Sequence, residues 1–249
     1  MPMSVGLRRF ARLLLPLIPE RAVVPILSGP LRGARWIAKS SIPGCWGGYF
    51  ESATQQFIVE ELGAGDTFID AGANVGFFTL LGSRTVGRSG KVVAFEPLQR
   101  NVELLEHHLE LNRVTNAVVV RSALSDHSGY EGFGSKSSPS MARLSNDGAE
   151  RVEVTTLDEA LTALDLGEVR LIKIDVEGAE AEVLAGAAST LSRQPRPSLV
   201  IATHGWRAHA ATIERLGGFG YRELDLEMDD PSGNGSVRFA SRVDHRGAR

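Results

Sequence analysis

The pattern of apolar and polar positions between residues 66 and 97 predicts a strand, a helix and a second strand. Apolar Phe68 and Ile69 form a short run that ends at acidic Asp70, which is typical of a buried strand. Residues 75–86 then read as a helix, and residues 90–97 read as a second apolar strand that ends at a proline. This order indicates the beginning of an α/β protein.

The same alternation of helices and strands continues through the rest of the chain. A helix that ends near Asn112 is indicated by apolar residues at spacings of four, three and four, which are Leu98, Val102, Leu105 and Leu109. Helices are also expected after residue 178 and over 207–216. Apolar runs predict further strands at 117–120, 169–174, 198–203, 221–226 and 236–241. We therefore expect an α/β fold, with a mostly parallel sheet and helices on both faces.

One internal segment, at about 130–150, interrupts this alternation. It is rich in Ser, Gly and Asn, so we expect a loop before Val152 and Val154 resume a strand. We interpret the loop as a lid over the substrate, because long loops in compact domains are often functional. A plain surface connection is the alternative.

Residues 1–50 differ in charge from the rest of the chain. They contain seven basic residues and one acidic residue. We expect a basic arm and a lead-in helix that pack on the core, and a weak contact with a membrane surface or a partner is the alternative. The apolar run 13–18 is interrupted by Pro16 and is too short to span a bilayer, and no clear signal-peptide cleavage site follows it.

Composition limits the number of domains and the kinds of partner. The chain has 249 residues, of which 43% are hydrophobic, so we expect one domain over 51–249 after the arm. A net charge of -3 argues against a general nucleic-acid binder. The single cysteine, Cys45, excludes an intrachain disulfide and a cysteine-based zinc site, which favours a cytoplasmic protein.

The segment DTFIDAGANVGFF, residues 66–78, contains the most informative motif. Gly72 and Gly76 allow the backbone to turn between strand and helix and to approach a ligand. A dinucleotide fingerprint, G-x-G-x-x-G, would need glycine at Asn74 and Phe77, so that register fails. The remaining pattern, Asp-x-Gly-x-Asn-x-Gly, favours S-adenosylmethionine (SAM) as the cofactor.

Four polar residues lie at or near the ends of predicted parallel strands, and they are Asp70, Glu96, Asp175 and His204. The carboxyl ends of parallel strands share one edge of a sheet, so we expect these side chains to converge. A carboxylate at Glu96, after the second strand, is placed to accept hydrogen bonds from the ribose hydroxyls of an adenosine. Helix capping is the alternative for each residue taken alone.

Several segments in order resemble the FkbM-type family of SAM-dependent methyltransferases. They are DAGANVGFFTLLGSRTVGRSGKVVAFEPLQRNVELLEHHLELN, TTLDEAL and LIKIDVEGAEAEVLAGAASTL, within a similarity that runs from about residue 31 to 226. The resemblance implies the class I methyltransferase (Rossmann-like) fold, with seven strands of which the last is antiparallel. It also implies methyl transfer, usually to a hydroxyl of a sugar, a lipid-linked glycan or a natural product.

The resemblance also implies which residues bind the cofactor. The methionine part of SAM would be surrounded by Asp70, Gly72, Asn74 and Gly76, and the ribose would be held by Glu96. Leu98 would pack on the adenine, with Ser122 and Asp126 as candidates for reading its edge. Asp175 would lie beside the sulfonium.

His204 is the leading candidate for the base that takes the acceptor's proton, because an unperturbed imidazole has a pKa near 6.5 and is largely neutral at pH 7. Asp175 and Glu177 are its rivals. The same three residues are also candidates for a divalent cation. We expect no metal, however, because the paired acid and amide ligands typical of metal-dependent O-methyltransferases are not visible.

The sequence therefore predicts a SAM-dependent O-methyltransferase that acts on a saccharide, a glycolipid or a natural-product small molecule, and not on nucleic acid. Two other functions stay open at this point. One is a nucleotide-sugar or NAD-linked oxidoreductase on a similar sheet. The other is a methyltransferase-like binding or scaffold module without catalysis.

Overall fold

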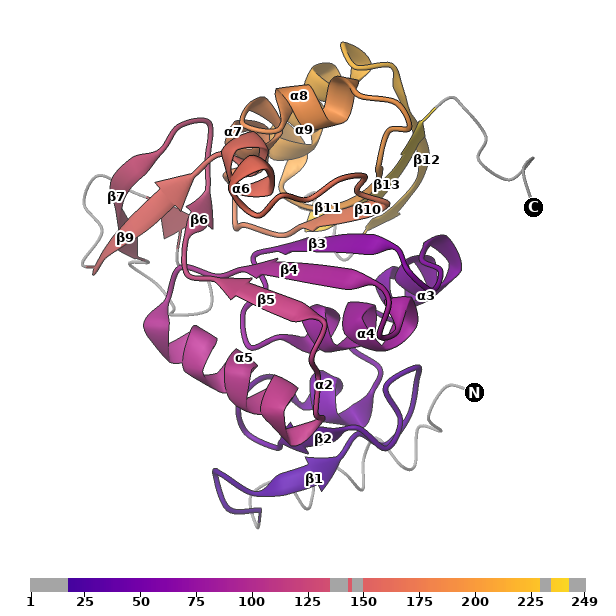
Figure 1. Ribbon diagram of the computed structural model, residues 1–249, viewed down its shortest axis with the longest axis vertical. Coiled ribbons are helices and arrows are strands. Elements are labelled where there is room, and N and C mark those ends of the chain that lie inside the picture. Colours follow the sequence, from indigo (N-terminus) through magenta and orange to yellow (C-terminus); the bar gives the residue numbers. More distant parts are fainter. Residues whose placement is uncertain (1–17, 135–142, 145–149, 229–233, 242–249) are drawn as a thin grey trace.

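A sheet of seven strands forms the centre of the computed structural model, which describes residues 18–134, 143–144, 150–228 and 234–241 (Figure 1). The strand order is β12-β13-β11-β10-β3-β4-β5. The neighbours from β11 to β5 are parallel, whereas β13 is antiparallel to both β11 and β12. The strand bounds are β3 Thr67–Ala71, β4 Lys91–Phe95, β5 Ala117–Val120, β10 Leu171–Ile174, β11 Ser198–His204, β12 Tyr221–Met228 and β13 Asn234–Ser241. This arrangement confirms the predicted mostly parallel α/β sheet.

Helices cover both faces of the sheet, as Figure 1 shows. One face carries α3 Ser52–Glu61, α4 Phe77–Val86 and α5 Gln99–Leu111, and the other carries α6 Leu157–Ala163, α7 Glu180–Ala185, α8 Ala188–Ser192 and α9 Trp206–Gly217. Successive residues of a strand point to opposite faces, so Phe68 packs in one core cluster and Ile69 in the other. Both faces of the central strands are buried, which explains why these strands are mostly apolar.

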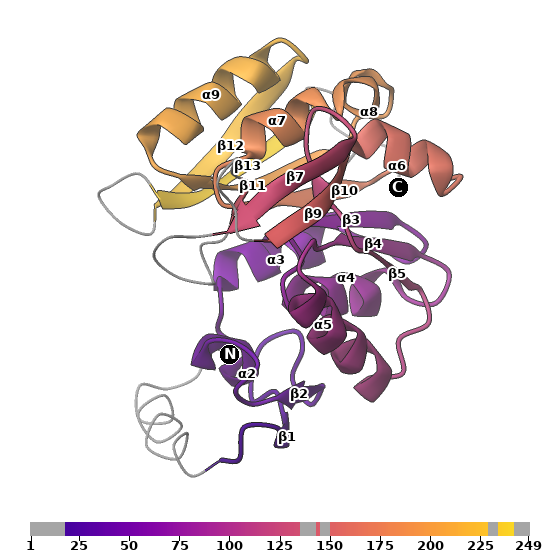
Figure 2. The same ribbon diagram turned by 90° about the vertical axis from the view of Figure 1, so that its left-hand side faces the viewer.

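A second, four-stranded sheet corrects the prediction of a loop at about 130–150. Its strands are β6 Ala123–Leu124, β7 Gly129–Gly134, β8 Arg143–Leu144 and β9 Glu150–Thr155, in the order β6-β9-β7-β8. Three glycines in β7 weaken its strand signal, and its pairing with β9 is what makes it a strand. The predicted loop otherwise falls on residues 135–142 and 145–149, outside the described residues. Figures 1 and 2 place β7 and β9 beside the carboxyl ends of the central strands.

The lead-in to the domain packs on the core, as predicted, but most of it is not a helix. Residues Val23–Pro25 (β1) and Arg35–Ile37 (β2) form an antiparallel pair, and the helix α2, Pro43–Gly47, has only five residues. Trp36 is fully buried and lies edge-on to the ring of Phe77 in α4. Residues 1–17 of the predicted arm lie outside the described residues. Within the described residues, every helix falls short of the length and apolar character that crossing a membrane requires.

His108 of α5 joins the lead-in to the glycine turn. Its ring stacks on Trp36 with centroids 3.7 Å apart. Its Nδ1–H donates to the carbonyl of Val75 over 2.8 Å, and its Nε2 accepts from the amide of Ile37 over 3.2 Å. Burial is the main reason that the pKa of His108 is lowered from 6.5 to about 4. The folded protein therefore holds a neutral histidine at this position.

This burial predicts a loss of stability in mild acid. The unfolded chain takes up a proton at His108 below its ordinary pKa of 6.5, whereas the folded protein does so only near 4. The stability that comes from neutral His108 is fully present above pH 6.5 and is lost as the pH falls towards 4. By pH 5 the loss amounts to about 2 kcal/mol of unfolding free energy. Urea unfolding of wild type and His108→Asn at pH 7.5 and pH 5 measures the difference. The variant should lose that part of the pH dependence, and the exposed neighbour variant His107→Asn should keep it.

Candidate functional site

Polar side chains meet at the carboxyl edge of the central strands. Asp175 follows β10 directly, Glu96 follows β4, and His204 is the last residue of β11. Asp70 lies one residue before the end of β3 and is fully buried. The predicted convergence at this edge is therefore found, with Asp70 lying deeper than the others.

The glycine turn fits closely against the neighbouring strand. Gly72 has a φ of +76°, and a Cβ on it would lie 1.9 Å from the carbonyl oxygen of Asp175. The amides of Gly72 and Ala73 both donate to the carbonyl of Phe95, at 3.0 and 2.9 Å. Only glycine at position 72 permits the close approach to the carbonyl of Asp175, so the turn packs directly on the residue that follows β10.

A pocket lies between the glycine turn, the end of β4 and the second sheet, and we call it the glycine-turn pocket. Its polar lining comes from Gly72, Asn74, Glu96, Asn101, Asp175 and Glu177. Its apolar lining includes Leu98, Leu124 and Phe133. An apolar slot beside a buried carboxylate suits a ligand with both a flat ring and hydroxyl groups.

Glu96 is held rigidly at the floor of this pocket. Its Oε1 accepts from the amide of Leu98 (3.0 Å) and from the side chain of Asn101 (3.1 Å), and its Oε2 accepts from the amide of Asn74 (2.9 Å). Burial raises the pKa of Glu96, and these hydrogen bonds oppose the rise. A carboxylate offers about four acceptor positions, so Glu96 still has capacity for a ligand donor.

Four of the predicted cofactor residues do not line the glycine-turn pocket. Asp70 and Gly76 lie behind it, and a Cβ on Gly76 would lie 2.8 Å from Leu105, so this glycine serves the packing of α5. Ser122 is buried and donates to the carbonyls of Ala123 and Glu153. Asp126 is exposed and pairs with His127 at 2.8 Å. The backbone between them reaches the pocket instead, through Ala123 and Leu124.

Lys173 is a site residue that the sequence analysis did not identify. Its Nζ lies 3.3 Å from Asp70 Oδ1, 3.6 Å from Asp175 Oδ2 and 3.3 Å from the carbonyl oxygen of Gly72, which accepts from it. The attraction of these two carboxylates outweighs burial and raises the pKa of the ammonium. Asp70 also accepts from Thr79 over 2.7 Å. The available signal was a lysine inside the otherwise apolar strand LIKI, residues 171–174.

A second pocket, of about 490 Å³, opens on the other side of Asp175. It is lined by the lead-in (Ser40, Ser41 and Phe50), by Phe78 of α4, and by Lys173, Glu177 and His204. Because Asp175 and Glu177 line both pockets, they stand at the boundary between them.

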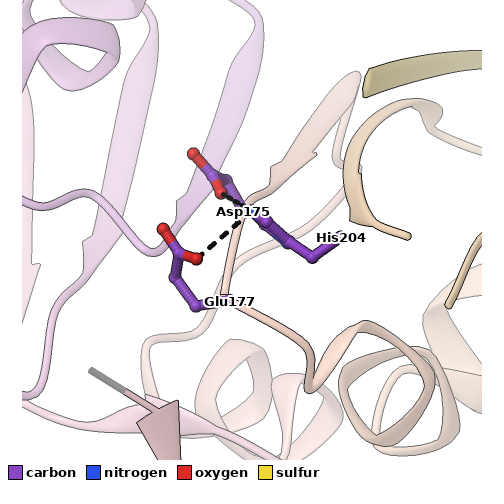
Figure 3. A group of neighbouring side chains, drawn as sticks. All are labelled: Asp175, Glu177 and His204. Atoms are coloured by element: carbon purple, nitrogen blue, oxygen red, sulfur yellow. Dashed lines mark ion pairs between the residues drawn. The ribbon is translucent and has the colours of Figure 1, made fainter. Parts of the chain in front are cut away.

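His204 lies among three carboxylates, two of which Figure 3 shows. Its Nε2 is 3.3 Å from Glu177 Oε2 and 3.8 Å from Asp175 Oδ1, and its Nδ1 is 3.2 Å from Glu180 Oε1. The hydrogen bond to Glu180 is the main cause that raises the pKa of His204 to about 9. The expectation of a largely neutral imidazole at pH 7 is therefore wrong for this arrangement. Burial raises the pKa of Glu177, which makes it a stronger base than an ordinary glutamate.

The fold is shared with solved methyltransferase structures of low sequence identity. An rRNA methylase from Streptococcus thermophilus superposes with a TM-score of 0.53 at 14% identity, over 76% of this chain and 95% of that one. A ribosomal protein L11 methylase from Lactobacillus delbrueckii subsp. bulgaricus gives 0.51 at 10% identity, over 78% and 80%. Fibrillarin from Aeropyrum pernix, solved with natively bound SAM, gives 0.50 at 14%, over 72% and 68%. No curated protein matches the chain.

These structures and the site at the carboxyl edge define a class I methyltransferase fold. The methyltransferase FkbM domain model matches residues 70–223, which is more than half of the chain. The chain therefore belongs to the FkbM methyltransferase family, as its sequence motifs indicated. The assignment supports a methyltransferase in place of an oxidoreductase.

Because Lys173 is buried between carboxylates, replacing it should lower the stability of the protein far more than replacing an exposed lysine. Lys173→Met removes the ammonium and leaves the carboxylates of Asp70 and Asp175 without it, which should cost about 3–5 kcal/mol of unfolding free energy. Urea denaturation measures the loss. Lys91→Met, at the exposed start of β4, is the control and should stay within about 0.5 kcal/mol of wild type. Equal losses in the two variants would contradict the role given to Lys173.

Proposed function

We propose that this protein is a SAM-dependent O-methyltransferase whose acceptor is a hydroxyl of a saccharide, a glycolipid or a natural-product small molecule. The single observation that carries the proposal is the boundary position of Asp175 and Glu177 between two pockets. The pocket on one side fits an adenosine cofactor, and the pocket on the other side is large enough for a sugar-sized acceptor.

The residues that line the glycine-turn pocket suit the hydroxyl groups and the flat ring of SAM. Gly72 lines the pocket with backbone alone, and Glu96 offers a buried carboxylate for the ribose hydroxyls. Leu98 and Leu124 provide apolar surface for the adenine. SAM, when bound, supplies a methyl carbon that its sulfonium makes reactive. The solved fibrillarin structure with SAM supports this cofactor on the same fold.

The residues of this chain contribute by positioning the acceptor and by handling its proton. Holding an acceptor oxygen in line with the methyl group is worth roughly 7–11 kcal/mol in favourable cases. Removing the hydroxyl proton adds about 10² to 10⁴-fold. Glu177, Asp175 and His204 face the second pocket and are the candidates for that step. In this scheme the carboxylates take the proton first, because His204 already carries one at pH 7.

The second pocket has both polar and apolar lining residues, which suits an acceptor that carries hydroxyl groups. Ser40, Ser41 and Asn101 offer hydrogen bonds, and Phe50 and Phe78 offer flat apolar surface. The net charge of -3 continues to favour a small molecule over nucleic acid. We place the reaction in the cytoplasm, and weak contact of the basic arm, within residues 1–50, with a membrane surface stays the alternative to packing on the core. Strand β7 brings Phe133 to the glycine-turn pocket, so we continue to propose that the segment at about 130–150 acts as a lid over the substrate.

Cofactor binding tests the proposal first. Isothermal titration calorimetry should show binding of SAM and of S-adenosylhomocysteine, and a thermal-shift comparison should favour SAM over NAD. Glu96→Gln should weaken binding about tenfold or more, because it removes a charged acceptor. Glu106→Gln, on the exposed side of α5, is the matched control and should bind like wild type. A folded protein that binds neither SAM nor its product would overturn the proposal.

Turnover tests the catalytic residues. Asp175→Asn should lower the rate of methyl transfer by about 10² to 10⁴-fold, as expected for a lost base. His204→Asn should also lower the rate, because it removes the charged partner of Asp175 and Glu177, and it should still bind SAM. The assay incubates labelled SAM and the enzyme with cell extracts and identifies the methylated product. Unchanged turnover in His204→Asn would remove this residue from the mechanism. Recovery of methylated protein or nucleic acid would contradict a small-molecule acceptor.

A further inference from the structure

Asp175, Glu177 and His204 have the geometry of ligands around a common ion. Their ligand atoms all lie within 4.8 Å of one another, and Figure 3 shows them pointing toward one another. Two ligand atoms about 2.1 Å from one ion are about 3.0 Å apart at right angles and about 4.2 Å apart when opposite. The distances from His204 Nε2, 3.3 Å to Glu177 and 3.8 Å to Asp175, fall in this interval.

The other nitrogen of His204 has the partner that a metal-binding histidine usually has. Its Nδ1 lies 3.2 Å from Oε1 of Glu180, a glutamate that is only 1% exposed. The amide of Gly178 donates to the same Oε1 over 2.9 Å and fixes its position. Binding of a cation releases the proton on Nε2, and because Nδ1–H donates to Glu180, the lone pair of Nε2 then faces Asp175 and Glu177. A buried carboxylate in this role orients the ring and makes the imidazole a better ligand.

The charges around the three side chains also suit a cation. Three carboxylates surround His204, and Lys173 approaches Asp175 through Oδ2. Oδ1 of Asp175 is the oxygen that faces His204, so the ion pair with Lys173 leaves this oxygen available. Like charges held this close repel one another, and a divalent cation between them removes that cost.

We propose that Asp175, Glu177 and His204 form a binding site for one divalent cation of the Mg²⁺ or Mn²⁺ class, with Glu180 as a positioning residue. Two carboxylate oxygens and one imidazole nitrogen are ligands that these ions accept, and three ligands leave open positions. The site adjoins the second pocket, so in catalysis an open position of the ion would take the acceptor oxygen. That catalytic role rests on the proposed methyl transfer, whereas the binding of the ion does not.

The test uses Mn²⁺ as the probe, because its electron paramagnetic resonance signal falls when it binds to protein. Titration of the full chain should show one site, and Mg²⁺ should compete for it. Glu177→Gln and His204→Asn should each weaken Mn²⁺ binding at least tenfold. Glu180→Gln, which touches only the far side of the ring, should weaken it about 10 to 100-fold. Circular dichroism and SAM calorimetry on the same samples establish that each variant is folded.

His127 provides a matched control elsewhere on the surface. It also lies between two carboxylates, 2.8 Å from Asp126 and 3.1 Å from Glu131, and it is about half exposed. His127→Asn should leave Mn²⁺ binding unchanged, which separates a built site from any histidine near acidic groups.

The outcomes separate the cation site from the proposed function. Failure of wild type to bind Mn²⁺ at millimolar concentration, with SAM still bound, would overturn the cation site alone. Binding that survives in both Glu177→Gln and His204→Asn would overturn it as well. Mn²⁺ binding that these variants lose, in a protein that does not bind SAM, would support the site and reject the proposed function.

Discussion

The position of the site depends on one buried ammonium group, that of Lys173. It lies between Asp70 of β3 and Asp175 after β10, and it donates to the carbonyl of Gly72. Two neighbouring strands and the glycine turn are thereby fixed at the same point. Buried carboxylates are unfavourable without a partner, so this arrangement is stable only when all its members are present. The same contact sets where Asp175 enters the boundary between the two pockets.

The lead-in to the domain contributes to the site through packing. Trp36 stacks on His108, and His108 donates a hydrogen bond to the carbonyl of Val75 in the glycine turn. The segment that ends at Phe50 then forms one wall of the second pocket. Because the pocket lies between the lead-in and the central sheet, changes in that segment would alter the shape of the second pocket and leave the central sheet in place. The glycine-turn pocket, by contrast, lies between the central sheet and the second, smaller sheet.

Electrostatics divide the site into two parts. Glu96 has three fixed hydrogen bonds and an apolar surrounding, which suits the recognition of a neutral ligand group. The ring of His204 has a carboxylate at each nitrogen, so this part of the site favours a positive charge on or beside the ring. A proton and a metal ion are the two ways to supply that charge. Both hold the negative side chains together beside the second pocket.

The sequence by itself determined the alternation of strands and helices, the glycine turn and the family, because these depend on local periodicity and on short motifs. It also placed Glu96, Asp175 and His204 at one edge, since strand ends of a parallel sheet must meet there. Only the tertiary structure decided that β7 is a strand, that Lys173 is charged in the core, and that Ser122 and Asp126 lie outside the pocket. It likewise decided that His204 lies between Glu177 and Glu180. Each of these depends on residues distant in the sequence, whose approach fixes pairing, burial and charge in ways that local pattern does not encode.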